Sequence, residues 1–95
     1  MNPQPKIELK ILAYKRPQRY AVHKAVVAAL EEVHRMNPSL QVIVEEIRKL
    51  EDIQVFTPVT IYPSLMLNGR LVCVGRFPRR EEIISWLTLE IENTL

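Results

Sequence analysis

The first third of the chain carries two hydrophobic periods in succession. Every second position from Ile7 to Ala13 is apolar, which predicts a β-strand with one buried face. From about Tyr20 to Met36 the apolar side chains recur every three or four residues, which predicts a helix with one buried stripe. Pro17 precedes this stripe and suits the first turn of the helix, where its missing N–H group is not needed. Pro38 disfavours helical backbone at the residue before it, so we expect the helix to end there.

The middle of the chain predicts a second strand and a short second helix. Residues Leu40–Val44 are rich in β-branched side chains and are flanked by turn residues, which predicts a strand buried on both faces. Two strands joined through a helix pair in parallel by a right-handed crossover. The helical spacing of Leu50 and Ile53 favours a helix over about residues 50–56, and Pro58 ends it.

The clearest local pattern lies in the last third of the chain. Asn68-Gly69 separates two apolar runs, residues 64–67 and 70–74, which predicts an antiparallel hairpin because both residues of a type I′ turn need positive φ. A final amphipathic helix is expected to begin near Arg79, with Glu81 and Glu82 in its first turn, where the helix dipole favours acidic groups. The predicted order is β-α-β-α-β-β-α in one domain, residues 1–95, with residues 1–5 as a flexible lead.

Four short motifs follow one another between residues 61 and 83. They are a proline that opens the third strand, Pro63, the turn Asn68-Gly69, the pair Gly75-Arg76 and the helix start Arg80-Glu81-Glu82-Ile83. In this order and spacing they resemble the C-terminal half of the small glutaredoxin-like thioredoxins of archaea and bacteria, and the resemblance extends over nearly the whole chain. It implies a thioredoxin-like α/β fold, with a four-stranded mixed sheet and helices on both faces. It also implies that Pro63 is a cis-proline.

The same resemblance implies that the two redox-active cysteines of the family are replaced at residues 16–19. By its place relative to the first helix, the Cys-x-x-Cys motif of the family falls on Arg16-Pro17-Gln18-Arg19. A dithiol works through one thiolate, stabilised at a helix start, and a second thiol that resolves the mixed disulfide. Arginine supplies neither sulfur. We therefore expect no conventional disulfide oxidoreductase activity.

Basic residues gather in two segments, although the net charge is only +2. Residues 1–30 hold six basic residues and one acidic residue, and residues 61–80 hold four basic residues and no acidic one. The weak net charge argues against a specific nucleic-acid site, but the two segments would create a local anion site if they met. The proposed binding residues are Arg16, Arg19, Tyr62, Pro63 and Arg76. The simpler alternative is that the two arginines are solvated loop charges.

The remaining candidates favour structural roles. Cys73, the single cysteine, excludes an internal disulfide and a cysteine-based zinc site and fits a cytoplasmic protein. We expect it to be a buried apolar side chain, the alternative being a reactive lone thiol. His23 and His34 lie too far apart on one helix to share a metal ion, and we expect no cofactor. The longest uncharged apolar run, residues 25–30, is too short to span a membrane.

These observations predict a redox-inactive thioredoxin-fold domain that acts as a binding or adaptor protein and not as an enzyme. The expected partner is a protein or peptide, and the two arginines favour an acidic one. Two alternatives stay open. One is a thiol-disulfide oxidoreductase or glutathione-type transferase-like activity through the lone cysteine, and the other is a scaffold that self-associates, for example as a homodimer.

Overall fold

The computed structural model describes residues 6–94 and contains the predicted elements in the predicted order. The elements are β1 (Lys6–Leu12), α1 (Arg16–Met36), β2 (Gln41–Ile47), α2 (Leu50–Ile53), β3 (Ser64–Leu67), β4 (Arg70–Cys73) and α3 (Arg80–Thr94). The hairpin between β3 and β4 is confirmed, because Asn68 and Gly69 have φ values of 48° and 82°, as a type I′ turn requires. The predicted flexible lead, residues 1–5, lies outside the described residues.

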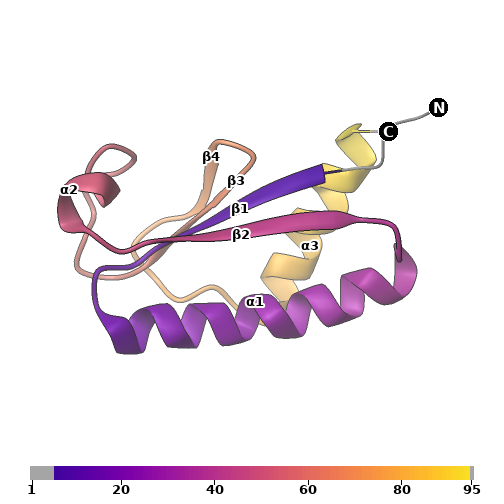
Figure 1. The fold of residues 1–95 in the computed structure, drawn as a ribbon, viewed down its shortest axis with the longest axis horizontal. Helices are drawn as coiled ribbons and strands as arrows, with labels where there is room; N and C mark the ends of the chain where they lie inside the picture. Colours follow the sequence, from indigo (N-terminus) through magenta and orange to yellow (C-terminus); the bar gives the residue numbers. More distant parts are fainter. Residues whose placement is uncertain (1–5, 95) are drawn as a thin grey trace.

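The four strands form one mixed sheet in the order β2-β1-β3-β4 (Figure 1). β1 pairs in parallel with β2, with Ile7 opposite Val42, and antiparallel with β3, with Leu9 opposite Leu67. The parallel pair is joined through α1, as expected for a crossover connection. This architecture confirms the α/β fold class. Because β1 and β2 run in the same direction, both end beside the first turn of α1.

The main core lies between the sheet and two helices, α1 and α3 (Figure 1). From β1 it takes Ile7, Leu9 and Ile11, which are fully buried. The helices contribute the stripes that their sequences predicted: Val22, Val26, Ala29 and Val33 from α1, and Ile83, Leu87 and Ile91 from α3. Each fully buried aliphatic side chain contributes about 1.5–3 kcal/mol to stability. This layer therefore holds α1 in a fixed position against the sheet.

The other face of the sheet is covered at one end only. There Ile53 of α2 packs with Leu12 and Met66 in a smaller buried cluster. The prediction that the second strand is buried on both faces is wrong, because its residues alternate between exposed and partly buried and Ile43 is 47% exposed. β2 is an edge strand, and α2, with four residues, is too short to shield it.

α1 begins earlier than its hydrophobic stripe. The stripe alone predicted a start near Tyr20, whereas the helix starts at Arg16, which confirms the prediction that Pro17 lies in its first turn. Proline presets the backbone for a helix at this position, so the polar residues 16–19 are helical although they add nothing to the stripe. Residues 16–19, to which the resemblance assigns the cysteine motif, are therefore the first turn of α1.

Candidate functional site

The first turn of α1 lacks the groups that commonly neutralise a helix N-terminus. Lys15 is the N-cap residue, with φ −84° and ψ 132°, and its side chain makes no capping hydrogen bond. The first turn holds no acidic residue. Instead, Arg16 and Arg19 add positive charge to the positive end of the helix dipole. A negatively charged group bound here would be stabilised by the free backbone N–H groups and by the guanidinium groups together.

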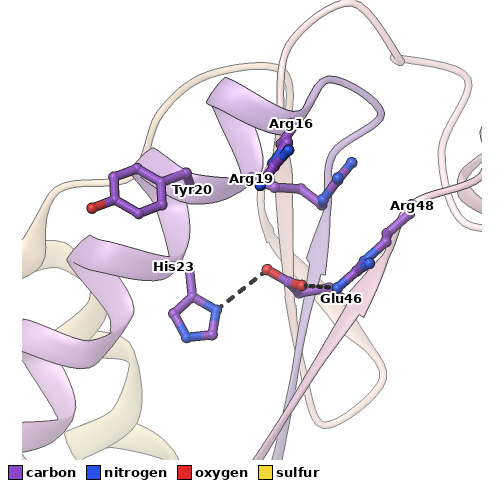
Figure 2. A pocket seen from close by; sticks show the side chains of 6 residues that line it. All are labelled: Arg16, Arg19, Tyr20, His23, Glu46 and Arg48. Atoms are coloured by element: carbon purple, nitrogen blue, oxygen red, sulfur yellow. Dashed lines mark hydrogen bonds and ion pairs between the residues drawn. The ribbon is translucent and has the colours of Figure 1, made fainter.

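Beside this turn lies an open cleft of about 420 Å³ between α1 and the end of β2 (Figure 2). It is lined by Arg16, Arg19, Tyr20 and His23 of α1 and by Glu46 and Arg48. The last two residues reach the cleft because β2 runs parallel to β1, so that its C-terminal end lies beside the turn that leads into α1. The structure thus brings both arginines of the first turn to one cleft.

The cleft holds more positive than negative charge. Its one carboxylate, Glu46, has Oε1 at 2.8 Å from Nη2 of Arg48 and Oε2 at 3.3 Å from Nδ1 of His23. The hydrogen bond from Arg48 lowers the pKa of Glu46, and desolvation opposes this effect. The carboxylate therefore stays ionised near neutral pH and balances one of the three arginines that line the cleft.

Arg16 and Arg19 differ in what their side chains contact. Nη1 of Arg19 donates hydrogen bonds to the carbonyl oxygens of Ala13, at 3.1 Å, and Tyr14, at 2.9 Å. These bonds fix the turn between β1 and α1, and the carbonyl partners leave the charge of Arg19 uncancelled. The side chain of Arg16 is exposed and has no hydrogen bond or ion pair within residues 6–94. Arg16 is therefore available to a ligand, whereas Arg19 also has a structural task.

The loop that leads into β3 lies next to the first turn of α1. Nε2 of Gln18 donates a hydrogen bond of 3.1 Å to the carbonyl oxygen of Ile61, which ties the loop to α1. Ile61 and Tyr62 are 70% and 53% exposed. Neither backbone polar group of Tyr62 is hydrogen-bonded within the part of the chain that the structure describes. Tyr62 is not among the residues of the cleft, so the two features are neighbours and not one pocket.

Pro63 follows this exposed segment and is buried. Its carbonyl oxygen accepts a hydrogen bond of 3.0 Å from the backbone amide of Arg76, which joins the start of β3 to the loop after β4. The cis form implied by the resemblance is not found, because every described peptide bond is trans. The trans form is favoured by about 0.5–1 kcal/mol before proline. The hydrogen bond from the amide of Arg76 to Pro63 is present with this trans peptide bond.

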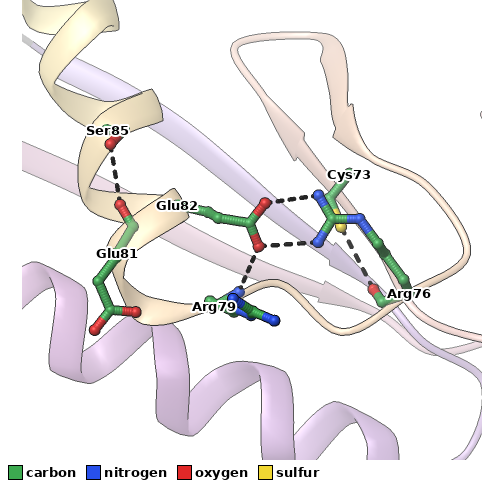
Figure 3. Close-up of polar contacts among 6 residues, drawn as sticks. All are labelled: Cys73, Arg76, Arg79, Glu81, Glu82 and Ser85. Carbon is green, nitrogen blue, oxygen red and sulfur yellow. Dashed lines mark hydrogen bonds and ion pairs between the residues drawn. The ribbon is translucent and has the colours of Figure 1, made fainter.

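The side chain of Arg76 points toward Glu82 of α3 (Figure 3) and is not among the residues that line the cleft. Its two terminal nitrogens bind the two carboxylate oxygens of Glu82 at 2.9 and 2.7 Å. Oε1 of Glu82 also accepts a hydrogen bond of 3.0 Å from the amide of Arg79, and the pKa of Glu82 is lowered to about 2, chiefly by Arg76. The structure therefore does not bring the side chain of Arg76 together with Arg16 and Arg19, because a carboxylate in the first turn of α3 binds it.

Cys73 is buried at the end of β4, on the sheet edge opposite to β2. Its Sγ donates a hydrogen bond of 3.4 Å to the carbonyl oxygen of Arg76 (Figure 3). Burial raises the pKa of this thiol, which lowers the fraction of reactive thiolate at neutral pH. These contacts support its interpretation as a small apolar side chain.

Sequence reasoning missed four residues of the cleft: Tyr20, His23, Glu46 and Arg48. His23 follows Arg16 by seven positions and Arg19 by four, which places the three on one side of a helix. This spacing could have identified His23 as a member of the site. Glu46 and Arg48 carry no such signal, because their position depends on the pairing of β2 with β1.

Comparison with known protein families finds one that covers most of the chain. A family described as "thioredoxin domain" matches residues 10–88. The chain belongs to this thioredoxin-domain family. No curated protein and no solved structure gives a significant match. In the described part of this thioredoxin domain, no helix is long and apolar enough to cross a membrane, and no three His, Cys, Asp or Glu residues are grouped so as to hold a metal ion.

Proposed function

We propose that this thioredoxin domain is a non-catalytic binding or adaptor domain that holds an acidic segment of a partner protein at the start of α1. The observation that carries the proposal is the cleft itself. It gathers Arg16, Arg19, Arg48 and His23 around a single carboxylate, Glu46. Guanidinium groups bind carboxylates and phosphates through two parallel hydrogen bonds, so the cleft suits an anionic group of the partner.

Disulfide exchange is not part of the proposed function. The chain has one cysteine, and that cysteine lies on β4, at the other edge of the sheet from the cleft. The positions where the family carries its dithiol hold Arg16 and Arg19, which cannot exchange electrons with a disulfide. The raised pKa of the Cys73 thiol also disfavours the alternative of a one-cysteine oxidoreductase or transferase.

The exposed segment before Pro63 supplies the second contact in this proposal. The free backbone groups of Tyr62 can hydrogen-bond to an extended peptide, as at other exposed backbone edges. The side chains of Ile61 and Tyr62 offer apolar surface beside them. Gln18 joins this segment to the first turn of α1. One extended partner segment could therefore contact the free backbone and place its acidic group near Arg16.

Two finer features belong to the proposal. The motifs from Pro63 to Ile83 support a closer kinship with the small glutaredoxin-like thioredoxins of archaea and bacteria. A single buried thiol and the absence of a disulfide among the described residues support a location in a reducing compartment, the cytoplasm.

A titration followed by NMR tests the proposed function. Inorganic phosphate and a short acidic peptide are added separately to isotope-labelled protein, and the backbone amide shifts are recorded. We expect saturable shifts at residues 16–20 and 46–48 with both probes, and at residues 61–63 with the peptide alone. Replacing Arg16 or Arg48 by glutamine should weaken binding by roughly tenfold, because each removes a charge-assisted hydrogen bond worth about 1.5 kcal/mol or more.

Arg79→Gln is the matched control. Arg79 is exposed and does not line the cleft, so this variant should bind both probes as the unaltered chain does. If binding is weakened equally in all three variants, the effect comes from the net charge of the chain and not from the cleft, which contradicts the proposal. Shifts that avoid residues 16–20 would place the binding site elsewhere and contradict the proposal.

A further inference from the structure

The outward face of α1 is uncovered. In Figure 1, α1 forms the outer layer of the molecule, and no other element lies against its far side. Tyr20 is 70% exposed on this face, and Lys24, Val27 and Glu31 are exposed with it. Lys24 and Glu31 have no ion pair within the described residues. The helix thus presents apolar side chains together with two unpaired opposite charges.

The shape of this face suits the packing of another helix. A shallow groove of about 340 Å³ is lined by Tyr20, His23, Lys24, Val27, Ala28 and Glu31. Packed helices insert side chains into holes formed by residues i, i+3, i+4 and i+7. The six lining residues form two such holes in succession, one that begins at Tyr20 and one that begins at Lys24. The small side chain of Ala28 leaves room for a side chain to enter the second hole.

We propose that this face binds the same face of α1 in a second copy of the chain, with the two helices antiparallel. A two-fold axis that passes between Val27 and Ala28 places Lys24 of each copy beside Glu31 of the other. It also places Tyr20 beside Arg35, a suitable cation–π pair, and Val27 over the second hole. Two-fold symmetry repeats each contact, so the dimer gains two opposite-charge pairs.

Charge selects the antiparallel direction. Parallel helices in the same register would place Lys24 against Lys24 and Glu31 against Glu31, and like charges at such positions repel each other. Antiparallel helices also bring opposite ends of their dipoles together. The start of α1, with its two arginines, then lies near the negative end of the other helix.

This contact does not rest on the proposed function, although Tyr20 and His23 line both the groove and the anion cleft. Lys24, Val27 and Glu31 do not line the anion cleft, and the groove requires no partner segment at the start of α1. One helix face is smaller than the roughly 800 Å² per partner of a standard stable interface. The dimer should therefore dissociate on dilution.

Sedimentation equilibrium over a range of protein concentrations tests the dimer. The apparent mass of the unaltered chain should rise toward that of a dimer as its concentration approaches about 1 mM. Lys24→Glu or Glu31→Lys alone places like charges at both pair positions and should raise the dissociation constant roughly tenfold. In a mixture of the two variants, one chain has glutamate at both positions 24 and 31 and the other has lysine at both. The mixed dimer should form at least as tightly as the unaltered one.

Lys6→Glu makes the same change in charge on the opposite face of the sheet and should leave the association unchanged. All these positions are exposed, and lysine and glutamate have similar helix propensities, so helical circular dichroism should be retained. An unaltered chain that stays monomeric up to about 1 mM, or a Lys24→Glu variant that associates as well as the unaltered chain, overturns the dimer. A mixture that associates no better than its separate components overturns the antiparallel register.

Discussion

Gly75 lies in the loop after β4, next to the segment that leads into β3. Its φ is 68°, and the φ of Gly69 in the β3–β4 turn is 82°, so both have the left-handed backbone that disfavours a side chain. A Cβ on Gly75 would lie 2.8 Å from Cγ1 of Val59, whereas a Cβ on Gly69 meets no atom within 4 Å. Replacing each glycine by alanine therefore separates the cost of backbone conformation from the cost of the contact with Val59.

The expected costs follow from these two differences. Gly69→Ala should lower the free energy of unfolding by about 1–2 kcal/mol, because alanine adopts left-handed backbone at that cost. Gly75→Ala should lower the free energy of unfolding by about 1 kcal/mol more than Gly69→Ala, because its Cβ overlaps Val59. This added cost is at the low end for overpacking, since Val59 is partly exposed and can move. The total cost of Gly75→Ala, about 2–3 kcal/mol, is a large part of the roughly 5–10 kcal/mol that stabilise a domain of this size.

Urea unfolding, followed by the fluorescence of Trp86 and by circular dichroism, measures these costs. The cost of Gly75→Ala should then be measured again in a chain that already carries Val59→Ala. In that background the loss of unfolding free energy should fall to the value found for Gly69→Ala. Equal costs for the two single alanine variants would show that Val59 does not press on Gly75. A double variant without recovery would show that the added cost has another origin. In either case the described packing of the loop before Pro63 would be wrong.

Three other perturbations test the electrostatics of the chain. Because burial raises the pKa of Cys73, iodoacetamide should modify the native thiol at least about tenfold more slowly than the thiol of the urea-unfolded chain; equal rates would show an exposed thiol. The pKa of Glu82 is about 2 in the folded chain against 4.5 ordinarily, so its stabilising effect should be complete above about pH 4.5 and should be lost as the pH falls toward 2. Urea unfolding of Glu82→Gln should show a smaller loss over this range, and an unchanged pH dependence would contradict the Arg76 pair. Lys15→Asp supplies an N-cap to α1 and should raise stability by about 1 kcal/mol while it weakens phosphate binding at the same helix start; tighter binding in calorimetry would contradict the site.

The parts of the fold that sequence predicted well are those that local chemistry determines. The turn at Asn68-Gly69 follows from two residues that tolerate positive φ, and the buried stripe of α1 follows from its own spacing. The burial of β2 was predicted wrongly because it depends on what covers the strand. A β-branched run is compatible with a central strand and with an edge strand, and only the sheet order places β2 at the edge.

The candidate site likewise contains residues that the local sequence predicts and residues whose position depends on the tertiary structure. A helix start with two arginines is visible in the sequence, and the structure brings Arg16 and Arg19 to one cleft. Arg48 joins them through strand register, which no local pattern encodes. Arg76 was expected beside them because its loop approaches Pro63, and its backbone amide does bind there. Its side chain is long enough to reach Glu82 instead. The backbone of Arg76 therefore lies beside Pro63, while its guanidinium group lies at the start of α3.

The starts of α1 and α3 are opposite solutions to the same problem, the unpaired N–H groups and positive dipole of a helix N-terminus. In α3, Glu82 accepts a hydrogen bond from the amide of Arg79 and also pairs with Arg76, so the chain itself supplies the negative charge. In α1 the first turn contains no acid, and the nearest carboxylate of the cleft, Glu46, is held by Arg48 and His23. The chain thus neutralises the start of α3 with its own carboxylate and leaves the start of α1 cationic. The complementary acid is then most simply supplied by the partner, and this is why the proposed site lies at α1 and not at α3.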